Sequence, residues 1–183
     1  MVRLTVSGQP GSGTSTLVDK LCQHFGWSAL NGGQVFRDAA TDRGMELLEF
    51  GKLCKEDLSV DRELDAILKQ RMQTVNGPEI IESRLAGWWA YDLNIDCVRL
   101  WIEVSVNERA RRIVTREGGT IEQRLQQADE RMATDQARFA ELYGFQPADE
   151  EPYNASIDGT NLDAEQVFDE TIALLDKRGI NNG

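Results

Sequence analysis

The stretch Gly8-Gln9-Pro10-Gly11-Ser12-Gly13-Thr14-Ser15-Thr16 decides the fold of this chain. It follows a β-branched run at residues 3–7, which predicts a buried strand, and it leads into apolar residues at helical spacing over 15–25. A loop that wraps a phosphate needs positive φ angles and a close approach of main-chain N–H groups, and glycine allows both. The helix that begins near Gly13 adds its dipole and its unpaired N–H donors. The stretch therefore predicts a phosphate-binding loop over residues 8–16.

One position departs from the GxxxxGK[ST] pattern of phosphate loops. Thr14 stands where that pattern has lysine, while Ser15 falls at the position of the hydroxyl that binds Mg²⁺. A threonine hydroxyl donates one hydrogen bond but brings no positive charge to the β- and γ-phosphates. Either another cation supplies that charge or turnover is slow. The alternative interpretation is a Gly-rich turn that binds nothing.

The rest of the chain alternates between strand and helix patterns. Further strands are predicted at residues 79–82, 97–104 and, more weakly, 155–158, with helical patterns at 33–44, 46–55, 60–74, 106–117, 120–142 and 163–178. Strands separated by helices indicate βαβ units, hence an α/β fold in which a parallel sheet of about five strands is flanked by helices. No Pro/Gly/Ser-rich linker divides the chain, so residues 1–183 are expected to form a single domain.

Composition and charge exclude several classes of function. The chain has 183 residues, with 20 basic against 31 acidic side chains and a net charge of −11, so its average field repels nucleic acids and anionic membranes. No apolar run approaches the roughly 20 residues that span a bilayer. Only five of the basic residues are lysines, which suits either simple solubility or a salt-rich cytoplasm. We expect a cytoplasmic protein with no nucleic-acid or membrane partner.

A second constellation, Glu82-Ser83-Arg84, ends the strand predicted at 79–82. In open α/β sheets, ligands bind beyond the carboxyl ends of the strands, so both charged side chains should face the cleft of the phosphate loop. Glu82 is a candidate ligand of Mg²⁺, through its waters, and Arg84 is a candidate bidentate clamp on a phosphate. The alternative is a surface salt bridge between these two residues.

The third feature is a region rich in arginine next to the Gly118-Gly119 break. Three of its arginines recur every seven residues and so share one side of a helix: Arg124, Arg131 and Arg138. Such a stripe predicts a hinged lid that carries cations to a polyphosphate, since phosphoryl transfer spreads negative charge over the moving oxygens. Acidic residues are interleaved with the arginines, so the alternative is a solvated helix face with i,i+4 ion pairs.

Two more arginines, Arg37 and Arg62, lie in helical patterns between the phosphate loop and Glu82. Arg37 comes one turn into a helix that starts after a Gly pair, where its side chain is a candidate ligand for a second phosphate. The aromatic pair Trp88-Trp89 follows Arg84, and its indoles either stack on a base or pack in the core.

Several stretches in this order resemble the archaeal-type cytidylate kinases, which are P-loop nucleoside monophosphate kinases. They are the phosphate loop at 8–16, Gly32-Gly33-Gln34-Val35-Phe36-Arg37, Asp61-Arg62-Glu63-Leu64-Asp65, Glu82-Ser83-Arg84-Leu85-Ala86-Gly87-Trp88, the segment 109–117 and Arg138-Phe139. The resemblance implies transfer of the γ-phosphoryl group of ATP to CMP or dCMP, with Mg²⁺. It implies a core, a monophosphate-binding insertion at about 32–75 and a lid at about 116–145.

The resemblance also implies roles for particular residues. Arg37, Arg62 and Arg84 would hold the monophosphate, and Arg116, Arg131 and Arg138 would act at the transferred group. A monomer is the expected state. Thr14 departs from the lysine usual at this position of the loop, which affects the expected catalytic rate. The stretch 154–158 is more polar than in the family, which affects the expected contacts to the ATP base. Two alternatives stay open: a kinase for another small acceptor, and a non-catalytic nucleotide-binding regulator, which Thr14 favours.

Overall fold

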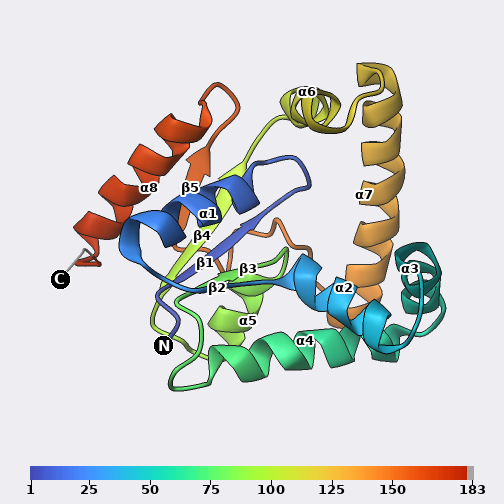
Figure 1. Cartoon of the computed structure of the whole chain (residues 1–183), viewed down its shortest axis with the longest axis horizontal. Helices are drawn as coiled ribbons and strands as arrows, with labels where there is room; N and C mark the ends of the chain where they lie inside the picture. Colours follow the sequence, from blue (N-terminus) through green and yellow to red (C-terminus); the bar gives the residue numbers. More distant parts are fainter. Residues whose placement is uncertain (181–183) are drawn as a thin grey trace.

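The computed structural model describes residues 1–180, apart from the side chains of Leu47, Leu48, Lys55 and Arg131. Its described part folds as one parallel sheet between helices (Figure 1). The strands are β1 (Leu4–Gly8), β2 (Ala29–Asn31), β3 (Ile80–Glu82), β4 (Val98–Glu103) and β5 (Ala155–Asp158). The helices are α1 (Thr14–Phe25), α2 (Gly32–Asp42), α3 (Leu47–Glu56), α4 (Leu58–Met72), α5 (Ala86–Asp92), α6 (Val106–Glu117), α7 (Ile121–Tyr143) and α8 (Ala164–Lys177).

The strands lie in the order β2-β3-β1-β4-β5, and every neighbouring pair is parallel. β1 is central, because Leu4 aligns with Ile80 of β3 on one side and with Val98 of β4 on the other. Leu4 and Val6 are fully buried, as expected for a parallel strand that is covered on both faces. In this register Val6 lies beside Glu82. The loop after β1 and the residues after β3 therefore emerge at the same edge of the sheet.

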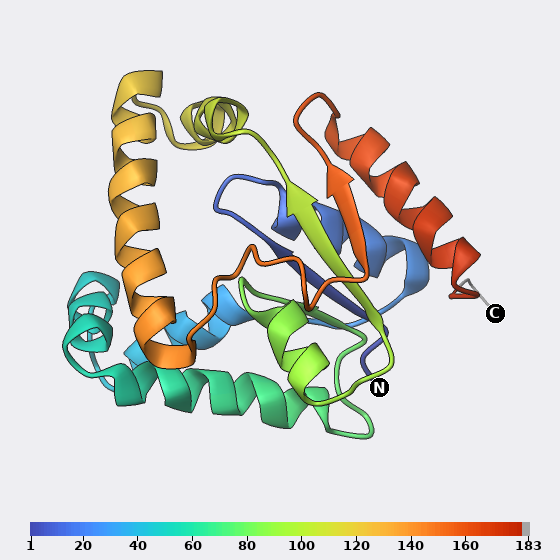
Figure 2. The same ribbon diagram turned by 180° about the vertical axis from the view of Figure 1, so that it is seen from behind.

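Helices cover both faces of the sheet. On one face α1 and α8 contact each other, and their apolar residues pack with those of the strands around Leu21, Leu100 and Leu175. On the opposite face α5 contacts β1 and β4, and Figure 2 shows it in front of the sheet with α1 behind. Here Trp89 and Phe50 lie at the centre of a second buried cluster. The two clusters fix the position of the strand ends on which the site is built.

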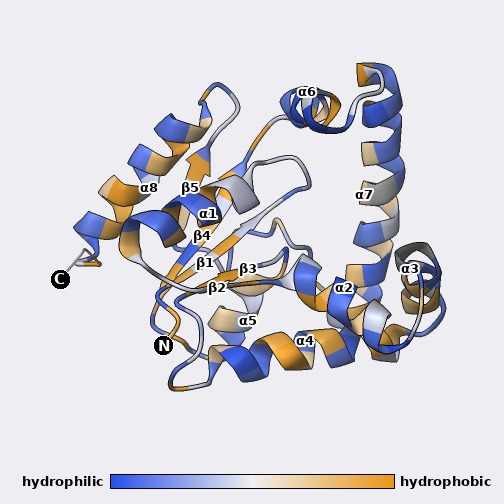
Figure 3. Ribbon diagram, viewed as in Figure 1, coloured by the Kyte–Doolittle hydropathy of each residue, from blue (hydrophilic) through white to orange (hydrophobic). Residues whose placement is uncertain are grey.

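Two helical excursions extend beyond the sheet. Along the chain, helices α2–α4 connect β2 to β3, and helices α6 and α7 connect β4 to β5. In space both groups lie beyond the edges of the sheet (Figure 1). Most of α6 and α7 is hydrophilic, whereas the strands are predominantly hydrophobic (Figure 3). Among the described side chains of α7, the buried apolar ones are Phe139 and Leu142, near its C-terminal end. The long helix is thus packed onto the rest of the molecule mainly by its last turns.

The fold expected from the sequence is confirmed, with small shifts at element ends. β5 and α6 occupy their predicted ranges, and the break at Gly118 separates α6 from α7. β2 was missed because its three residues include no β-branched side chain, and α5 because seven residues are too few for a helical period. Trp88 and Trp89 are buried in α5, which confirms core packing. None of the helices formed by the described residues has the length and apolar character that a bilayer crossing requires.

Candidate active site

The phosphate loop takes the conformation that its glycines allow. Gly11 and Gly13 have φ angles of 87° and 90°, in the left-handed region that side chains rarely adopt. Gly13 is the N-cap of α1, and no side chain of the described residues caps the first turn of this helix. The main-chain N–H groups of that turn are therefore left for another acceptor, as in a helix N-terminus that binds an anion.

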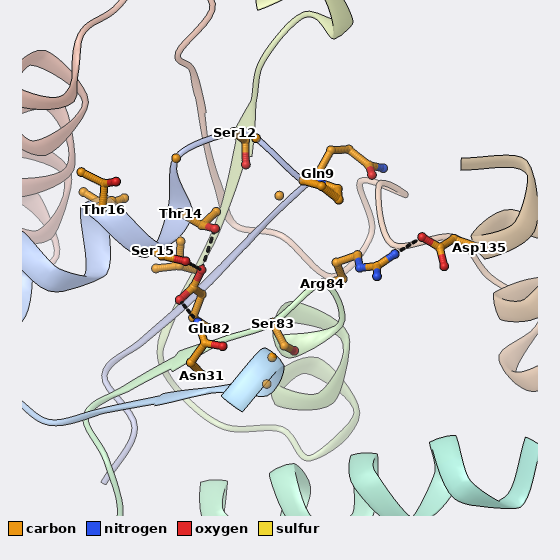
Figure 4. Close-up of a pocket in the computed structure, with 18 of the residues that line it drawn as sticks. Gln9, Ser12, Thr14, Ser15, Thr16, Asn31, Glu82, Ser83, Arg84 and Asp135 are labelled. Carbon is orange, nitrogen blue, oxygen red and sulfur yellow. Dashed lines mark hydrogen bonds and ion pairs between the residues drawn. The ribbon is translucent and has the colours of Figure 1, made fainter. Parts of the chain in front are cut away.

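Glu82 connects the loop to β3 through the hydroxyls of α1. Its Oε1 accepts hydrogen bonds from Thr14 Oγ1 at 2.7 Å and from Ser15 Oγ at 2.8 Å (Figure 4). Its Oε2 accepts from Asn31 Nδ2, and Asn31 also caps α2 by accepting from the N–H of Gln34 at 3.0 Å. Glu82 is 7% exposed. The predicted salt-bridge alternative between Glu82 and Arg84 is wrong, because the two side chains point to different partners.

The donors at this place fit Mg²⁺ that is shared with a polyphosphate. A hydroxyl and a carboxylate are hard oxygen ligands, and Mg²⁺ commonly takes one or two protein ligands beside phosphate oxygens and waters. Within the described part of the chain, no group of three or more His, Cys, Asp or Glu residues is placed to hold a metal by itself. Ser12 Oγ is buried without a hydrogen-bond partner among the described residues, as expected of a loop whose polar groups face a phosphate.

Two arginines of α6 donate hydrogen bonds to carbonyls of the phosphate loop. Arg109 donates to the carbonyl of Pro10 at 3.2 Å, and Arg112 donates to that of Ser12 at 3.2 Å. Arg112 also donates to the carbonyls of Gly159 at 2.7 Å and Leu162 at 3.1 Å, beyond β5. One guanidinium thus joins the phosphate loop to the loop between β5 and α8.

A single continuous cleft of about 1550 Å³ runs from the phosphate loop to α4 and α7. Its lining includes most of the residues singled out in the sequence: the loop 8–16, Arg37, Glu82, Arg84, Arg116 and Arg138. Arg62 is exposed on α4 and lies outside the cleft lining formed by the described residues. The side chain of Arg131 lies outside what the structure describes. Arg124 also lies outside this lining, where it donates to the carbonyl of Gly118 at 3.0 Å.

The arginines that line the cleft are held by neighbouring side chains. Arg37 donates to Gln34 Oε1 at 2.8 Å, and Arg116 pairs with Glu117. Arg84 points away from the phosphate loop and pairs with Asp135 of α7 (Figure 4). These three guanidiniums reach the cleft from different elements, so basic side chains line it on several sides.

A buried carboxyl, Asp65, lies at the far end of the cleft on α4. It accepts hydrogen bonds from Trp89 Nε1 at 3.1 Å and from the hydroxyl of Tyr143. Burial raises the pKa of Asp65 to about 6, against the opposing effect of these two hydrogen bonds. The pKa of Tyr143 is raised in turn by burial and by Asp65. The pair anchors the end of α7 to α4.

Known proteins identify the family. A protein-family profile described as an AAA domain matches residues 7–138. A cytidylate kinase from Methanococcoides burtonii is 35% identical over 178 residues, covering 96% of this chain and 98% of the relative. The chain belongs to the cytidylate kinase family, and its residues 7–138 to the AAA domain family. A cytidylate kinase from Methanopyrus kandleri is 31% identical over 182 residues, covering 96% of this chain and 93% of the relative.

Solved structures of other kinases share the fold of this chain. A gluconokinase from Sinorhizobium meliloti superposes with a TM-score of 0.63 at 16% identity and covers 97% of this chain and 93% of that one. A shikimate kinase from Bacteroides thetaiotaomicron gives a TM-score of 0.62 at 12% identity, with 96% and 98% covered. At this identity the likeness concerns the fold alone. The P-loop kinase fold and the family resemblance drawn from the motifs are both confirmed.

Several residues of this candidate site were missed in the sequence. Asn31 directly precedes a Gly pair, which is a typical N-cap position, and this was the available signal for its place beside Glu82. Asp135 stands three residues before Arg138 and so shares its helix face. Nothing local signals that Arg112 bonds to Gly159 and Leu162, because that contact spans about 50 residues of chain.

Proposed function

We propose that this chain transfers the γ-phosphoryl group of ATP to CMP or dCMP, giving ADP and the nucleoside diphosphate. The observation that carries the proposal is that the phosphate loop and the arginines Arg37, Arg84, Arg116 and Arg138 line one cleft. The relatives named cytidylate kinase, aligned over nearly the whole chain, support the same activity. A non-catalytic regulator is not favoured.

ATP would bind with its β- and γ-phosphates in the loop 8–16, over the free N–H groups of α1. Ser15 and, through water, Glu82 would hold Mg²⁺, which when bound neutralises charge on the phosphates. Thr14 donates to Glu82 and brings no positive charge, so the side chains that neutralise the triphosphate belong to other elements. Arg116 reaches the cleft from the end of α6 and is the candidate nearest in the chain to the Gly118 break.

The acceptor would lie between the loop and helices α2–α4. Arg37 and Arg84 are the cleft arginines proposed to hold its phosphate, with Arg62 as the third member from the family motif. No covalent intermediate is needed. The chain positions the acceptor oxygen in line with the γ-phosphorus, and Arg116, Arg131 and Arg138 stabilise the charge that develops on the transferred group.

Closure of residues 116–145 over the cleft would exclude water. Such closure is needed because water in an open site would hydrolyse ATP. In this proposal residues 1–183 act as one domain, with the monophosphate-binding insertion at 32–75. We further propose that the protein works as a monomer in the cytoplasm.

A coupled ADP-release assay tests the proposal. Mg-ATP is supplied with CMP, dCMP, UMP, AMP or no acceptor, at low and at high KCl. We expect turnover that depends on CMP or dCMP. Turnover with a different acceptor would reassign the substrate, and ATP binding without turnover on any acceptor would contradict a kinase function.

A further inference from the structure

Four charged side chains form a continuous chain across the acceptor half of the cleft: Arg84, Asp135, Arg138 and Asp61. We refer to these four residues as the charge chain. Arg84 pairs with Asp135, whose other oxygen lies 3.3 Å from Nη2 of Arg138, and Nη1 of Arg138 lies 3.3 Å from Asp61 Oδ2. All four line the cleft, and their side chains are only 13–25% exposed.

The charge chain joins three separate parts of the fold. Arg84 lies just after β3, Asp135 and Arg138 lie on α7, and Asp61 lies on α4. Figure 4 shows Arg84 extended from the core towards Asp135, away from the phosphate loop. The arginine that would hold the acceptor's phosphate is therefore already engaged by a carboxylate of the long helix.

A carboxylate and a phosphate compete for the same face of a guanidinium. Both present two oxygens at the spacing of the guanidinium fork, and both make charge-assisted hydrogen bonds with it. The formal charges of the four side chains in the charge chain cancel. A phosphate and a carboxylate on the same face of Arg84 would repel each other in a half-buried site, which is costly. Withdrawal of the carboxylate would open this face of Arg84 to the acceptor's phosphate.

Asp135 is better placed to withdraw than Asp61. It lies on α7, of which two described apolar side chains are buried, whereas α4, which carries Asp61, buries four. Asp61 lies on α4, which contacts α2, α3 and α5 and is fixed in place. Phe139 supports both arginines from the side, with its ring 5.7 Å from the guanidinium carbon of Arg84 and 5.0 Å from that of Arg138.

We propose that Asp135 is a built-in competitor for the acceptor's phosphate: it holds Arg84 in the free protein and is displaced when the nucleoside monophosphate binds. This rests on the proposed function, in which Arg84 holds that phosphate. Nε of Arg138, which is buried without a hydrogen-bond partner among the described residues, is available to the incoming oxygens. Displacement also removes one tether between α7 and the core, which links acceptor binding to movement of the long helix.

Calorimetric titration of the whole protein with CMP, without ATP, tests the proposal on wild type and Asp135→Asn. The asparagine keeps the shape of the side chain but not the charge that binds Arg84. We expect Asp135→Asn to bind CMP about five-fold more tightly and to unfold at a lower urea concentration. A five-fold gain corresponds to about 1 kcal/mol, the size of one partly exposed ion pair. A residue that merely supports the structure would lower both stability and affinity.

Three controls accompany the titration. Asp129→Asn makes the same change on an exposed part of α7 and should leave CMP affinity unchanged, and Asp135→Glu keeps the competing charge and should stay near wild type. ATP affinity should not change in Asp135→Asn. Equal or weaker CMP binding by Asp135→Asn than by wild type would overturn the proposal. A wild type that binds AMP or UMP but not CMP would overturn only the assigned acceptor. The two proteins are then compared with that nucleotide instead. If no monophosphate binds, both proposals fail.

Discussion

At the scale of single residues, Thr14 leaves the phosphate loop without a fixed positive charge. Its hydroxyl donates to Glu82 at 2.7 Å, so it shares with Ser15 the work of orienting that carboxylate. Arg112 of α6, which donates to the loop carbonyl of Ser12, also bonds two carbonyls beyond β5 and the carboxylate of Glu108. Charge at the triphosphate therefore depends on Mg²⁺ and on side chains that reach the cleft from outside the loop.

Replacing Thr14 by lysine should tighten ATP binding in the absence of Mg²⁺. The ammonium would lie within several ångströms of the triphosphate, where one added charge is worth about 1–2 kcal/mol, or roughly ten-fold in Kd. The measurement is the Kd of ATP in excess EDTA for wild type and Thr14→Lys. Thr14→Gln, a long but uncharged side chain, is the matched control and should show no gain. Equal affinities in all three proteins would mean that charge at this position does not limit ATP binding.

Asp65 predicts a pH dependence of stability. Its pKa is raised by burial from 3.8 to about 6, so the folded protein favours the protonated form. The stability that this raised pKa contributes is fully present below pH 4 and is lost as the pH rises through 6. We expect wild type, relative to Asp65→Asn, to lose roughly 2 kcal/mol of unfolding free energy between pH 4.5 and 7.5. Urea unfolding at both pH values measures this, with Asp129→Asn as the exposed control. A difference that does not change with pH would contradict the raised pKa.

At the scale of elements, α6 acts as a brace for two loops. Arg112 donates to carbonyls on both sides of the nucleotide end of the cleft, and its side chain is 27% exposed. Each charge-assisted hydrogen bond of this kind contributes more to the free energy of unfolding than a neutral one does, and its loss leaves a carbonyl oxygen without its donor. Arg112→Ala should therefore lower the free energy of unfolding by about 2–3 kcal/mol and weaken ATP binding.

Arg111 provides a matched control for that substitution. It is the neighbouring residue on α6, its side chain is 66% exposed, and it pairs with Glu108 at 3.4 Å. Arg111→Ala should change stability by less than about 0.5 kcal/mol. Urea unfolding and ATP titration of the two variants make the comparison. Equal effects of the two substitutions would mean that the contacts of Arg112 with the loops contribute nothing to the site.

The elements also show how far sequence reasoning reaches. The phosphate loop could be predicted because its glycines, flanking strand and helix are contiguous in the chain. Glu82 and Arg84 could be placed at the same edge because parallel strands end together. The partners of these residues could not be predicted: the Arg84–Asp135 pair spans 51 residues, and β2 and α5 owe their existence to packing rather than to a periodic pattern. Which face of α7 meets the core is a tertiary outcome that spacing alone does not fix.

At the scale of the whole molecule, the balance of 31 acidic against 20 basic side chains creates a general repulsion in the folded state. The hydrophilic helices α6 and α7 (Figure 3) together carry seven acidic and seven basic side chains, whereas residues 144–180 carry nine acidic against two basic ones, so the excess of negative charge lies mainly elsewhere than on α6 and α7. Salt screens charges that are separated by more than a Debye length, which falls from about 10 Å at 0.1 M to about 3 Å at 1 M. Screening favours the compact state more than the expanded one, because the charges are closer together when the chain is folded.

We therefore expect the thermal midpoint to rise as KCl increases from 0.1 to 1 M. The matched variant removes three exposed negative charges that lie apart on α7 and α8, by Asp129→Asn, Glu141→Gln and Asp169→Asn. It should have a higher midpoint at 0.1 M KCl and a smaller rise with salt, since less repulsion is left to screen. Calorimetry of both proteins across the KCl series makes the measurement. If the thermal midpoints of the two proteins rise in parallel, the effect of salt comes from hydration of apolar surface or from ion binding rather than from net charge.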